Sequence, residues 1–165
     1  MHTVNRISLD CLRETLKYDP NTGVFTWKVK PSKNIPVGAV AGTRNYYGYI
    51  VITIDKVMYQ AGRLAWYITH GFWPEQDIDH IDRCRSNNAL DNLRPATRSQ
   101  NLANKGKHKG AVPYKGVSIF RNKYRAYVYV RGKQIHLGLF NTAEEAHDAY
   151  IKAAKYYYGE FARGE

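Results

Sequence analysis

The chain has 165 residues, enough for one ordinary domain or two small ones, which excludes a large multidomain protein. Hydrophobic residues make up 44% and charged residues 24%, proportions typical of a folded protein rather than a disordered one. No stretch approaches the roughly 20 apolar residues of a membrane span, and the N-terminus lacks the apolar run of a signal peptide. We therefore expect a soluble protein of the cytoplasm, without a membrane partner.

Positive charge dominates the composition. The chain carries 25 Lys and Arg against 14 Asp and Glu, a net charge of +11. Residues 105–136 hold basic side chains and no acidic one, which favours a polyanionic partner, above all nucleic acid. The alternative is that the charge only keeps the protein soluble. Two cysteines, Cys11 and Cys84, are too few for a disulfide framework or a four-cysteine zinc site.

The first 70 residues predict a small mixed unit. Apolar periodicity, turn residues and β-branched runs indicate the elements. In chain order these are a helix capped by Ser8 and carrying Leu9, Leu12 and Leu16, a strand at 24–29, a hairpin of 47–54 and 57–61, and a helix at 63–70 that ends before Gly71.

The rest of the chain predicts a second mixed unit after a linker. Residues 78–95 indicate a compact ββ unit, and Thr97 with Gln100 forms the capping-box pattern of a helix start. Residues 105–113 are basic and lack apolar periodicity, which is typical of a linker. Downstream we expect strands at 114–120, 124–131 and 134–140, then a helix from a second capping box at Thr142 to Gly159.

One group of residues in the ββ unit and the helix after it could carry chemistry. Asp79 and His80 are adjacent, and the amides Asn92 and Asn101 follow. Histidine can take a proton from water near neutral pH. Carboxylate and amide oxygens suit Mg²⁺ or Mn²⁺, ions that offset charge on a phosphodiester during hydrolysis. Taken alone, Asp79 and Asn92 would more often be turn residues.

Residues 8–104 resemble the HNH endonuclease family, specifically the phage-type homing endonucleases with Asn as the last motif residue. The Asp-His pair, the spacing of twelve residues to Asn92 and of nine more to Asn101, and the Asn-Leu-Arg pattern carry the resemblance. It implies that His80 is the general base, that Asp79 and Asn101 bind a divalent metal, and that Asn92 holds the hairpin and helps to orient His80. It also implies an irregular backbone at Asp79 and His80, since adjacent residues of a regular strand face opposite ways.

The chain departs from that family at one position. The family often has His before the Arg-Leu-Ala-Trp segment, whereas this chain has Gly62. Any auxiliary contact made by that His is therefore in question, although the four motif residues are present.

Alternation along the downstream strands separates two faces. Arg125, Tyr127, Tyr129 and Arg131 share one face with Gln134 and His136, and Ala126, Val128, Ile135 and Leu139 share the face that meets the helix. A sheet face with cations, aromatic rings and amides suits a DNA groove. Partly exposed sheet tyrosines are the simpler reading of Tyr127 and Tyr129.

Residues 113–162 resemble the plant ethylene-response-factor (APETALA-type) DNA-binding domain. The segments Gly116-Val117, Lys123 to Ala126, His136 to Phe140 and Thr142 to Ala146 carry this resemblance. It implies that the sheet enters the major groove with the helix packed behind it. Mapped by motif, the groove-facing residues are Ser118, Phe120, Lys123, Arg125, Tyr127, Tyr129, Gln134 and His136.

Together these patterns and the two resemblances predict an α+β protein with a nuclease domain at 1–104 (ββα-metal core at 77–104), a linker at 105–113 and a DNA-binding domain at 114–162. The predicted activity is hydrolysis of double-stranded DNA with Mg²⁺, or Mn²⁺, and no small-molecule cofactor. A monomer or weak dimer would nick one strand per engagement, at a preferred site. Two alternatives remain, a noncatalytic DNA-binding protein with an HNH fold and an RNA-binding protein, because basic sheets with tyrosines also stack on single-stranded bases.

Overall fold

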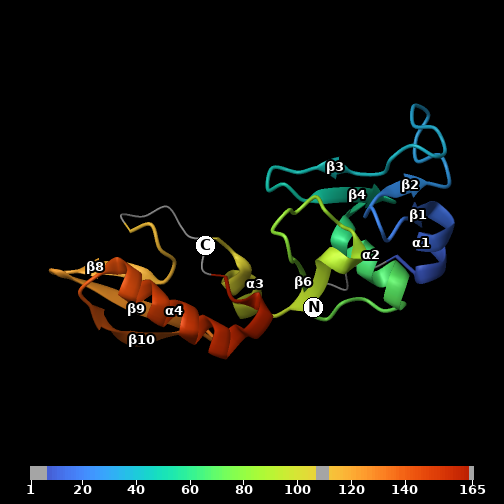
Figure 1. The fold of residues 1–165 in the computed structure, drawn as a ribbon. Coiled ribbons are helices and arrows are strands. Elements are labelled where there is room, and N and C mark those ends of the chain that lie inside the picture. Colours follow the sequence, from blue (N-terminus) through green and yellow to red (C-terminus); the bar gives the residue numbers. More distant parts are fainter. Residues whose placement is uncertain (1–6, 107–111, 164–165) are drawn as a thin grey trace. The chain divides into compact units, whose positions relative to one another are not determined.

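The computed structural model describes residues 7–106 and 112–163 (Figure 1). The chain forms two compact units, Met1–Pro95 and Ala96–Glu165. The division lies before the helix that follows Pro95, whereas the sequence predicted that the first domain reaches residue 104. Residues 107–111 of the predicted linker lie outside the described residues. In the described part of the chain, no helix is long and apolar enough to cross a membrane.

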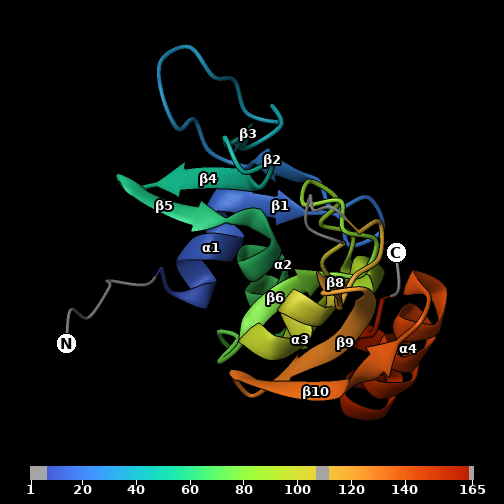
Figure 2. The same cartoon turned by 90° about the vertical axis from the view of Figure 1, so that its left-hand side faces the viewer.

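The first unit combines two helices with small antiparallel sheets. β1 pairs with β2, β4 lies between β3 and β5, and β6 pairs with β7 (Figures 1 and 2). The elements are α1 (Leu9–Thr15), β1 (Leu16–Tyr18), β2 (Phe25–Trp27), β3 (Thr43–Arg44), β4 (Ile50–Ile54), β5 (Val57–Gln60), α2 (Ala61–His70), β6 (Asp77–His80), the 3₁₀ turn η1 (Leu90–Asn92) and β7 (Leu93–Ala96).

Local signals set most of these boundaries. The Ser8 side chain accepts a hydrogen bond from the backbone of Cys11 and caps α1, as predicted. Leu16 was predicted to lie in that helix but begins β1, opposite Trp27. The apolar pattern requires only that Leu16 be buried. A residue of a strand can be buried as well as a residue of a helix, so the pattern did not distinguish the two.

The hairpin of β4 and β5 turns at Asp55 and Lys56, as the sequence predicted. Both residues have positive φ, 48° and 65°, the geometry of the tight turn that suits strand twist. Ile52 and Ile54 of β4 are buried and belong to one core with residues of α1, α2, β1 and β2. This core supports β6, whose Ile78 is one of its members.

The second unit begins with α3 (Arg98–Asn104), whose Thr97–Gln100 capping box forms as predicted. Ala103 packs with Phe161, and the Lys115 amine donates to the backbone carbonyl of Lys105 at 2.6 Å, just past the C-terminus of α3. Val112, predicted to lie in the linker, is a buried core residue. These contacts explain why α3 belongs to the second unit.

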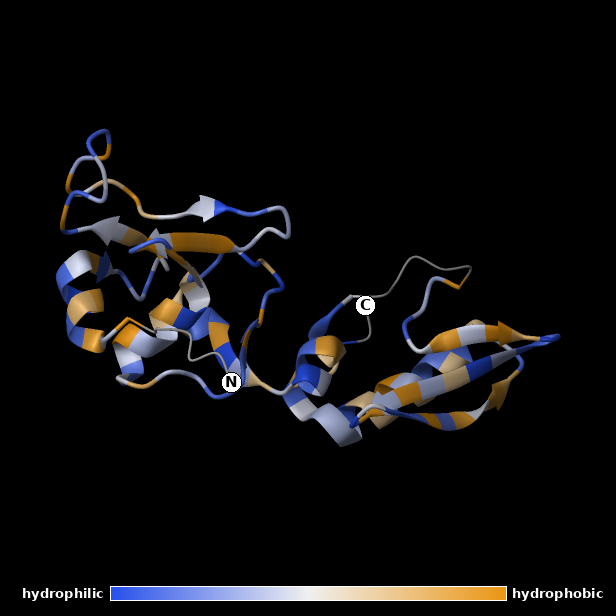
Figure 3. Cartoon of the chain, turned by 180° about the vertical axis from the view of Figure 1, so that it is seen from behind, coloured by the Kyte–Doolittle hydropathy of each residue, from blue (hydrophilic) through white to orange (hydrophobic). Residues whose placement is uncertain are grey.

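The rest of this unit is a three-stranded meander covered by one long helix. The elements are β8 (Val117–Phe120), β9 (Lys123–Val130), β10 (Lys133–Phe140), α4 (Ala143–Tyr158) and the 3₁₀ turn η2 (Gly159–Phe161). β9 is the central strand, and the strands show alternating polar and apolar bands in Figure 3. As predicted, Ala126 and Val128 are buried, and Val128 packs with Tyr150 and Ala154 of α4.

One part of the predicted alternation is wrong. β10 pairs regularly with β9 up to His136, and the register shifts between His136 and Gly138. Leu139 consequently pairs with Arg125 on the outer face and is 44% exposed, although strict alternation placed it against the helix. A β-bulge moves every later residue to the opposite face, and simple counting cannot detect it.

Candidate functional site

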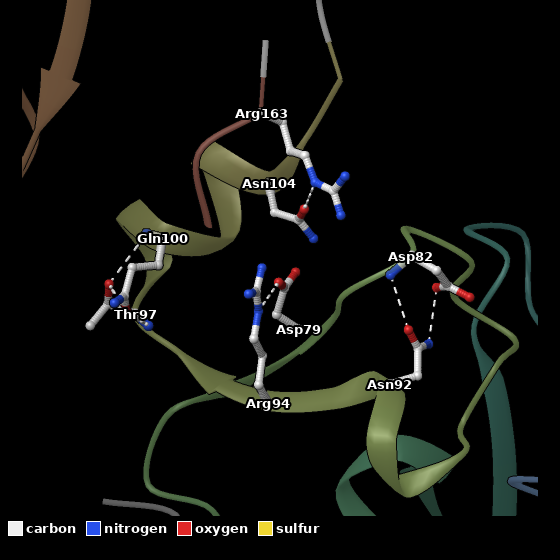
Figure 4. Close-up of polar contacts among 8 residues, drawn as sticks. All are labelled: Asp79, Asp82, Asn92, Arg94, Thr97, Gln100, Asn104 and Arg163. Carbon is white, nitrogen blue, oxygen red and sulfur yellow. Dashed lines mark hydrogen bonds and ion pairs between the residues drawn. The ribbon is translucent and has the colours of Figure 1, made fainter. Parts of the chain in front are cut away.

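The adjacent pair Asp79 and His80 lies at the end of β6, and both side chains are buried. The Asp79 carboxylate accepts a hydrogen bond from Arg94 Nε at 3.2 Å, a buried ion pair between β6 and β7 (Figure 4). The His80 Nε2 atom lies 3.2 Å from Oδ1 of Asn88. The structure therefore holds the carboxylate and the imidazole in place through different neighbours.

Both residues belong to β6, and Arg94 contacts the Asp79 carboxylate whereas Asn88 contacts the His80 imidazole. The irregular backbone expected at this pair stays a prediction. The first left-handed backbone after β6 is at Arg83, with φ of 67°.

Asn92 organises the loop that joins β6 to η1. Its amide nitrogen donates to the Asp82 carboxylate at 2.9 Å and to the Asn87 carbonyl at 2.8 Å, and its amide oxygen accepts from the Asp82 backbone at 3.0 Å (Figure 4). These bonds support the predicted role of Asn92 in holding the hairpin. The side-chain amide of Asn88 contacts the imidazole of His80, and the predicted role of Asn92 in orienting that ring stays a prediction.

Residues near the N-terminus support this loop from outside. The Tyr18 hydroxyl donates to the Asn88 carbonyl at 2.7 Å, and burial raises the pKa of Tyr18 to about 12, so the donor stays protonated at neutral pH. The Leu90 backbone donates to the Pro20 carbonyl at 2.8 Å. Gly23, with φ of 74°, packs directly against this loop, and a Cβ at Gly23 would be 2.3 Å from the backbone of Asn88. The turn at 19–23 thus fixes the position of Asn88.

Gly62 of α2 faces the same imidazole. A Cβ at this position would lie 3.2 Å from Asn88 Oδ1 and 3.7 Å from Nε2 of His80. The absence of a side chain at residue 62 therefore leaves the space in which the Asn88 amide meets His80. The departure from the family pattern at Gly62 is structurally linked to this contact.

The environment of His80 favours the neutral form of the imidazole. Burial lowers the pKa of His80, and the hydrogen bond with Asn88 and the nearby charges of Asp82 and Asp79 oppose that shift only in part. A neutral imidazole near pH 7 retains one nitrogen lone pair that can accept a proton. This is the protonation state that a general base needs.

The Asp79 carboxylate is a donor of the kind that a hard cation prefers. Among the described residues, no group of three His, Cys, Asp or Glu could hold a metal ion. Zinc sites use such groups, whereas Mg²⁺ often binds through one or two carboxylates together with phosphate oxygens and water. The carboxylate of Asp79 fits the second arrangement. Asn101 lies in α3 of the second unit, whose position relative to the first is not determined, so its pairing with Asp79 stays a prediction.

The eight predicted DNA-contact residues share one face of the C-terminal sheet. Ser118 pairs with Arg125 and Phe120 with Lys123 across β8 and β9. Across β9 and β10, His136 pairs with Tyr127 and Gln134 with Tyr129. Residues directly opposite each other point to the same face. This face holds a shallow pocket of about 240 Å³, lined by Phe120, Arg125, Tyr127, Gln134, His136 and Leu139.

Sequence reasoning missed three residues of the first site. Asn88 contacts the imidazole, Arg94 neutralises Asp79, and Asp82 accepts the bonds that shape the loop. Arg94 belongs to the Asn-Leu-Arg pattern, and the Asn-Asn dipeptide at 87–88 was visible in the polar run. Neither pattern indicates which residue each side chain contacts, because the contacted residue lies on the other side of the hairpin.

Comparison with known proteins shows that the stretch containing this site is similar to HNH endonucleases. Residues 59–103 match the family model described as HNH endonuclease. The chain is also 38% identical over 86 residues to a protein of Acanthamoeba polyphaga mimivirus that is named as an uncharacterized HNH endonuclease. That match covers 52% of this chain and 44% of the mimivirus protein, less than half of its length. The HNH domain is therefore in the middle of the chain, which corrects the expectation of an N-terminal one.

Proposed function

We propose that the protein is a metal-dependent DNA endonuclease that hydrolyses phosphodiester bonds and nicks one strand at a preferred site. The observation that supports this most directly is the buried imidazole of His80, which contacts Asn88 inside the stretch that matches the HNH family and whose pKa is lowered by burial. The substrate class follows from the family, since HNH nucleases act on nucleic acid. We assign double-stranded DNA as the substrate and the cytoplasm of a host cell as the location.

In the proposed reaction, His80 accepts a proton from the water that attacks the scissile phosphorus. The Asn88 side chain contacts the Nε2 atom of His80 and orients the ring. Asn88 lies in the loop that Asn92 organises. Asp79 and Asn101 would hold a Mg²⁺ ion, which supplies positive charge to the phosphate and the leaving oxygen. The bond between phosphorus and the 3′ oxygen breaks, and this oxygen takes a proton from solvent water, so that a 5′-phosphate and a 3′-hydroxyl remain. One motif per chain means that a monomer cuts one strand at a time.

The C-terminal sheet would supply the affinity for duplex DNA. Its face carries Lys123 and Arg125 for phosphates and Gln134 and His136 for base edges. Arg125, Gln134 and His136 also line the pocket on this face, which favours a binding role. Phosphate contacts fix position, and the amide and imidazole groups would provide sequence preference.

The test is cleavage of supercoiled plasmid with Mg²⁺, with Mn²⁺ and with EDTA. We expect metal-dependent nicking by the wild type and none by His80→Ala, because no other group replaces the base. His70→Ala is the matched control, since His70 is an exposed histidine of the same unit that stacks on Trp66 at the end of α2. Equal nicking by wild type and His80→Ala would refute the assignment of the base.

A noncatalytic DNA-binding protein is the second candidate. Gly62 favours it, because the histidine that the family often has at this position is absent. In this case the wild type would bind duplex DNA and would not nick with either ion. Stronger competition by single-stranded RNA than by duplex DNA would instead indicate an RNA-binding protein.

A further inference from the structure

We propose that the turn between β3 and β4, residues 44–49, is a second DNA contact, in which Tyr46 and Tyr47 lie against an exposed base or sugar and Arg44 binds a phosphate. We call residues 44–49 the tyrosine turn. The inference goes beyond the C-terminal sheet, because every residue that carries it lies in the first unit. It rests on the proposed function only in taking DNA as the partner.

The tyrosine turn presents two aromatic rings to solvent. Tyr46 is 95% exposed and Tyr47 is 67% exposed. Their rings meet edge to face, with centroids 5.3 Å apart. Two adjacent exposed tyrosines on a tight turn do not stabilise the core of the unit, whereas aromatic rings in nucleic-acid-binding proteins stack on bases of any sequence.

The backbone that carries these rings is fixed before any partner arrives. The Asn45 side chain accepts hydrogen bonds from the backbones of Tyr47 and Tyr49, both at 3.0 Å. The Asn45 backbone donates to the Tyr49 carbonyl at 2.8 Å, and Gly48 takes a left-handed φ of 88° that closes the turn. An ordered turn presents its side chains with less loss of conformational entropy on binding than a flexible loop would.

Two guanidinium groups accompany the rings. A Cβ at Gly48 would lie 3.5 Å from Nη2 of Arg44 and 4.0 Å from Cδ of Arg85. Positive charge beside exposed aromatic rings matches the phosphates and bases of DNA. An acidic peptide would use the arginines but would leave the two rings without a matching surface, so DNA is the partner that fits both features.

Arg85 connects the tyrosine turn to the nuclease site. It belongs to the loop after β6, donates from Nη1 to the Tyr47 carbonyl at 2.7 Å and lies over the Tyr49 ring at 4.9 Å. The Tyr49 ring in turn lies 5.9 Å from the His80 ring. Figure 1 shows this loop beside the β3–β4 turn. DNA held by the tyrosine turn would therefore lie next to the imidazole.

The experiment measures binding of the full chain to a fluorescein-labelled 30-base-pair duplex of mixed sequence with a short unpaired stretch at its centre, in EDTA so that no cleavage occurs. We expect Tyr46→Ala to weaken binding roughly five- to hundredfold, the range for loss of one aromatic stacking contact, and Tyr46→Phe to keep it. Tyr156→Ala is the matched control, because Tyr156 is 83% exposed and also meets a neighbouring tyrosine edge to face. It should bind as the wild type does.

A second measurement locates the contact directly. Irradiation with the same duplex containing iododeoxyuridine should cross-link the peptide of residues 45–56. Unchanged affinity of Tyr46→Ala, or an equal loss in Tyr156→Ala, would overturn the inference, as would cross-links confined to residues 114–140. The plasmid assay is independent of this result: a wild type that binds through the tyrosine turn but never nicks would refute the proposed nuclease and leave this inference intact.

Discussion

Substitution of Gly23 by alanine tests whether the turn at 19–23 holds the nuclease loop. Gly23 has φ of 74°, a conformation that costs an L-residue about 1–2 kcal/mol. The added Cβ would also lie 2.3 Å from the Ala89 nitrogen and from the Asn88 carbonyl carbon. These are backbone atoms that cannot rotate away, so overpacking adds about 1–3 kcal/mol. Gly23→Ala should therefore lower the free energy of unfolding by about 2–5 kcal/mol.

Gly38 provides the matched control. It lies in the same unit with φ of 84°, and a Cβ there would meet nothing within 4 Å. Gly38→Ala should cost only the conformational part, about 1–2 kcal/mol. Urea unfolding followed by circular dichroism measures both values, and plasmid nicking should fall more in Gly23→Ala because the Asn88 peptide must move. Equal destabilisation of the two variants would refute the contact between Gly23 and the loop.

Two further substitutions test contacts in each unit. Gly116 and Gly132 both have left-handed φ, but a Cβ at Gly116 would overlap the Tyr150 ring, whereas one at Gly132 would meet nothing within 4 Å. In urea unfolding, Gly116→Ala should therefore destabilise the second unit more than Gly132→Ala does. Arg94→Ala should cost about 3–5 kcal/mol, since it leaves the Asp79 carboxylate buried without its guanidinium. Adding Asp79→Ala should recover part of this loss, and a double variant less stable than Arg94→Ala alone would contradict the ion pair.

Features encoded within a few residues were predicted well from the sequence. Both capping boxes, Thr97 with Gln100 and Thr142 with Glu145, form with their two reciprocal bonds. The turn at Asp55 and Lys56 and the end of α2 at Gly71 also agree. In each case the hydrogen bond or dihedral angle depends on neighbours in the chain, so the sequence pattern contains the necessary information.

Features that depend on distant residues were not predicted. The bulge before Gly138 follows from how β10 fits against β9, and alternation alone placed Leu139 on the wrong face. The place of α3 in the second unit depends on contacts of Ala103 with Phe161 and of the Lys105 carbonyl with Lys115, which no local pattern indicates. Packing energies of this kind decide between local patterns that are equally acceptable by themselves.

The nuclease site combines both kinds of information. The types and spacing of Asp79, His80 and Asn92 were sufficient to suggest the chemistry, yet the orientation of the imidazole depends on Asn88, whose position depends on Tyr18 and residues 20–23. These supports precede the stretch that matches the HNH family, which begins at residue 59. Because a general base must be held within hydrogen-bond reach of its water, the motif alone is not a complete active site. Within the first unit, the N-terminal hairpin therefore fixes the loop that the family motif supplies.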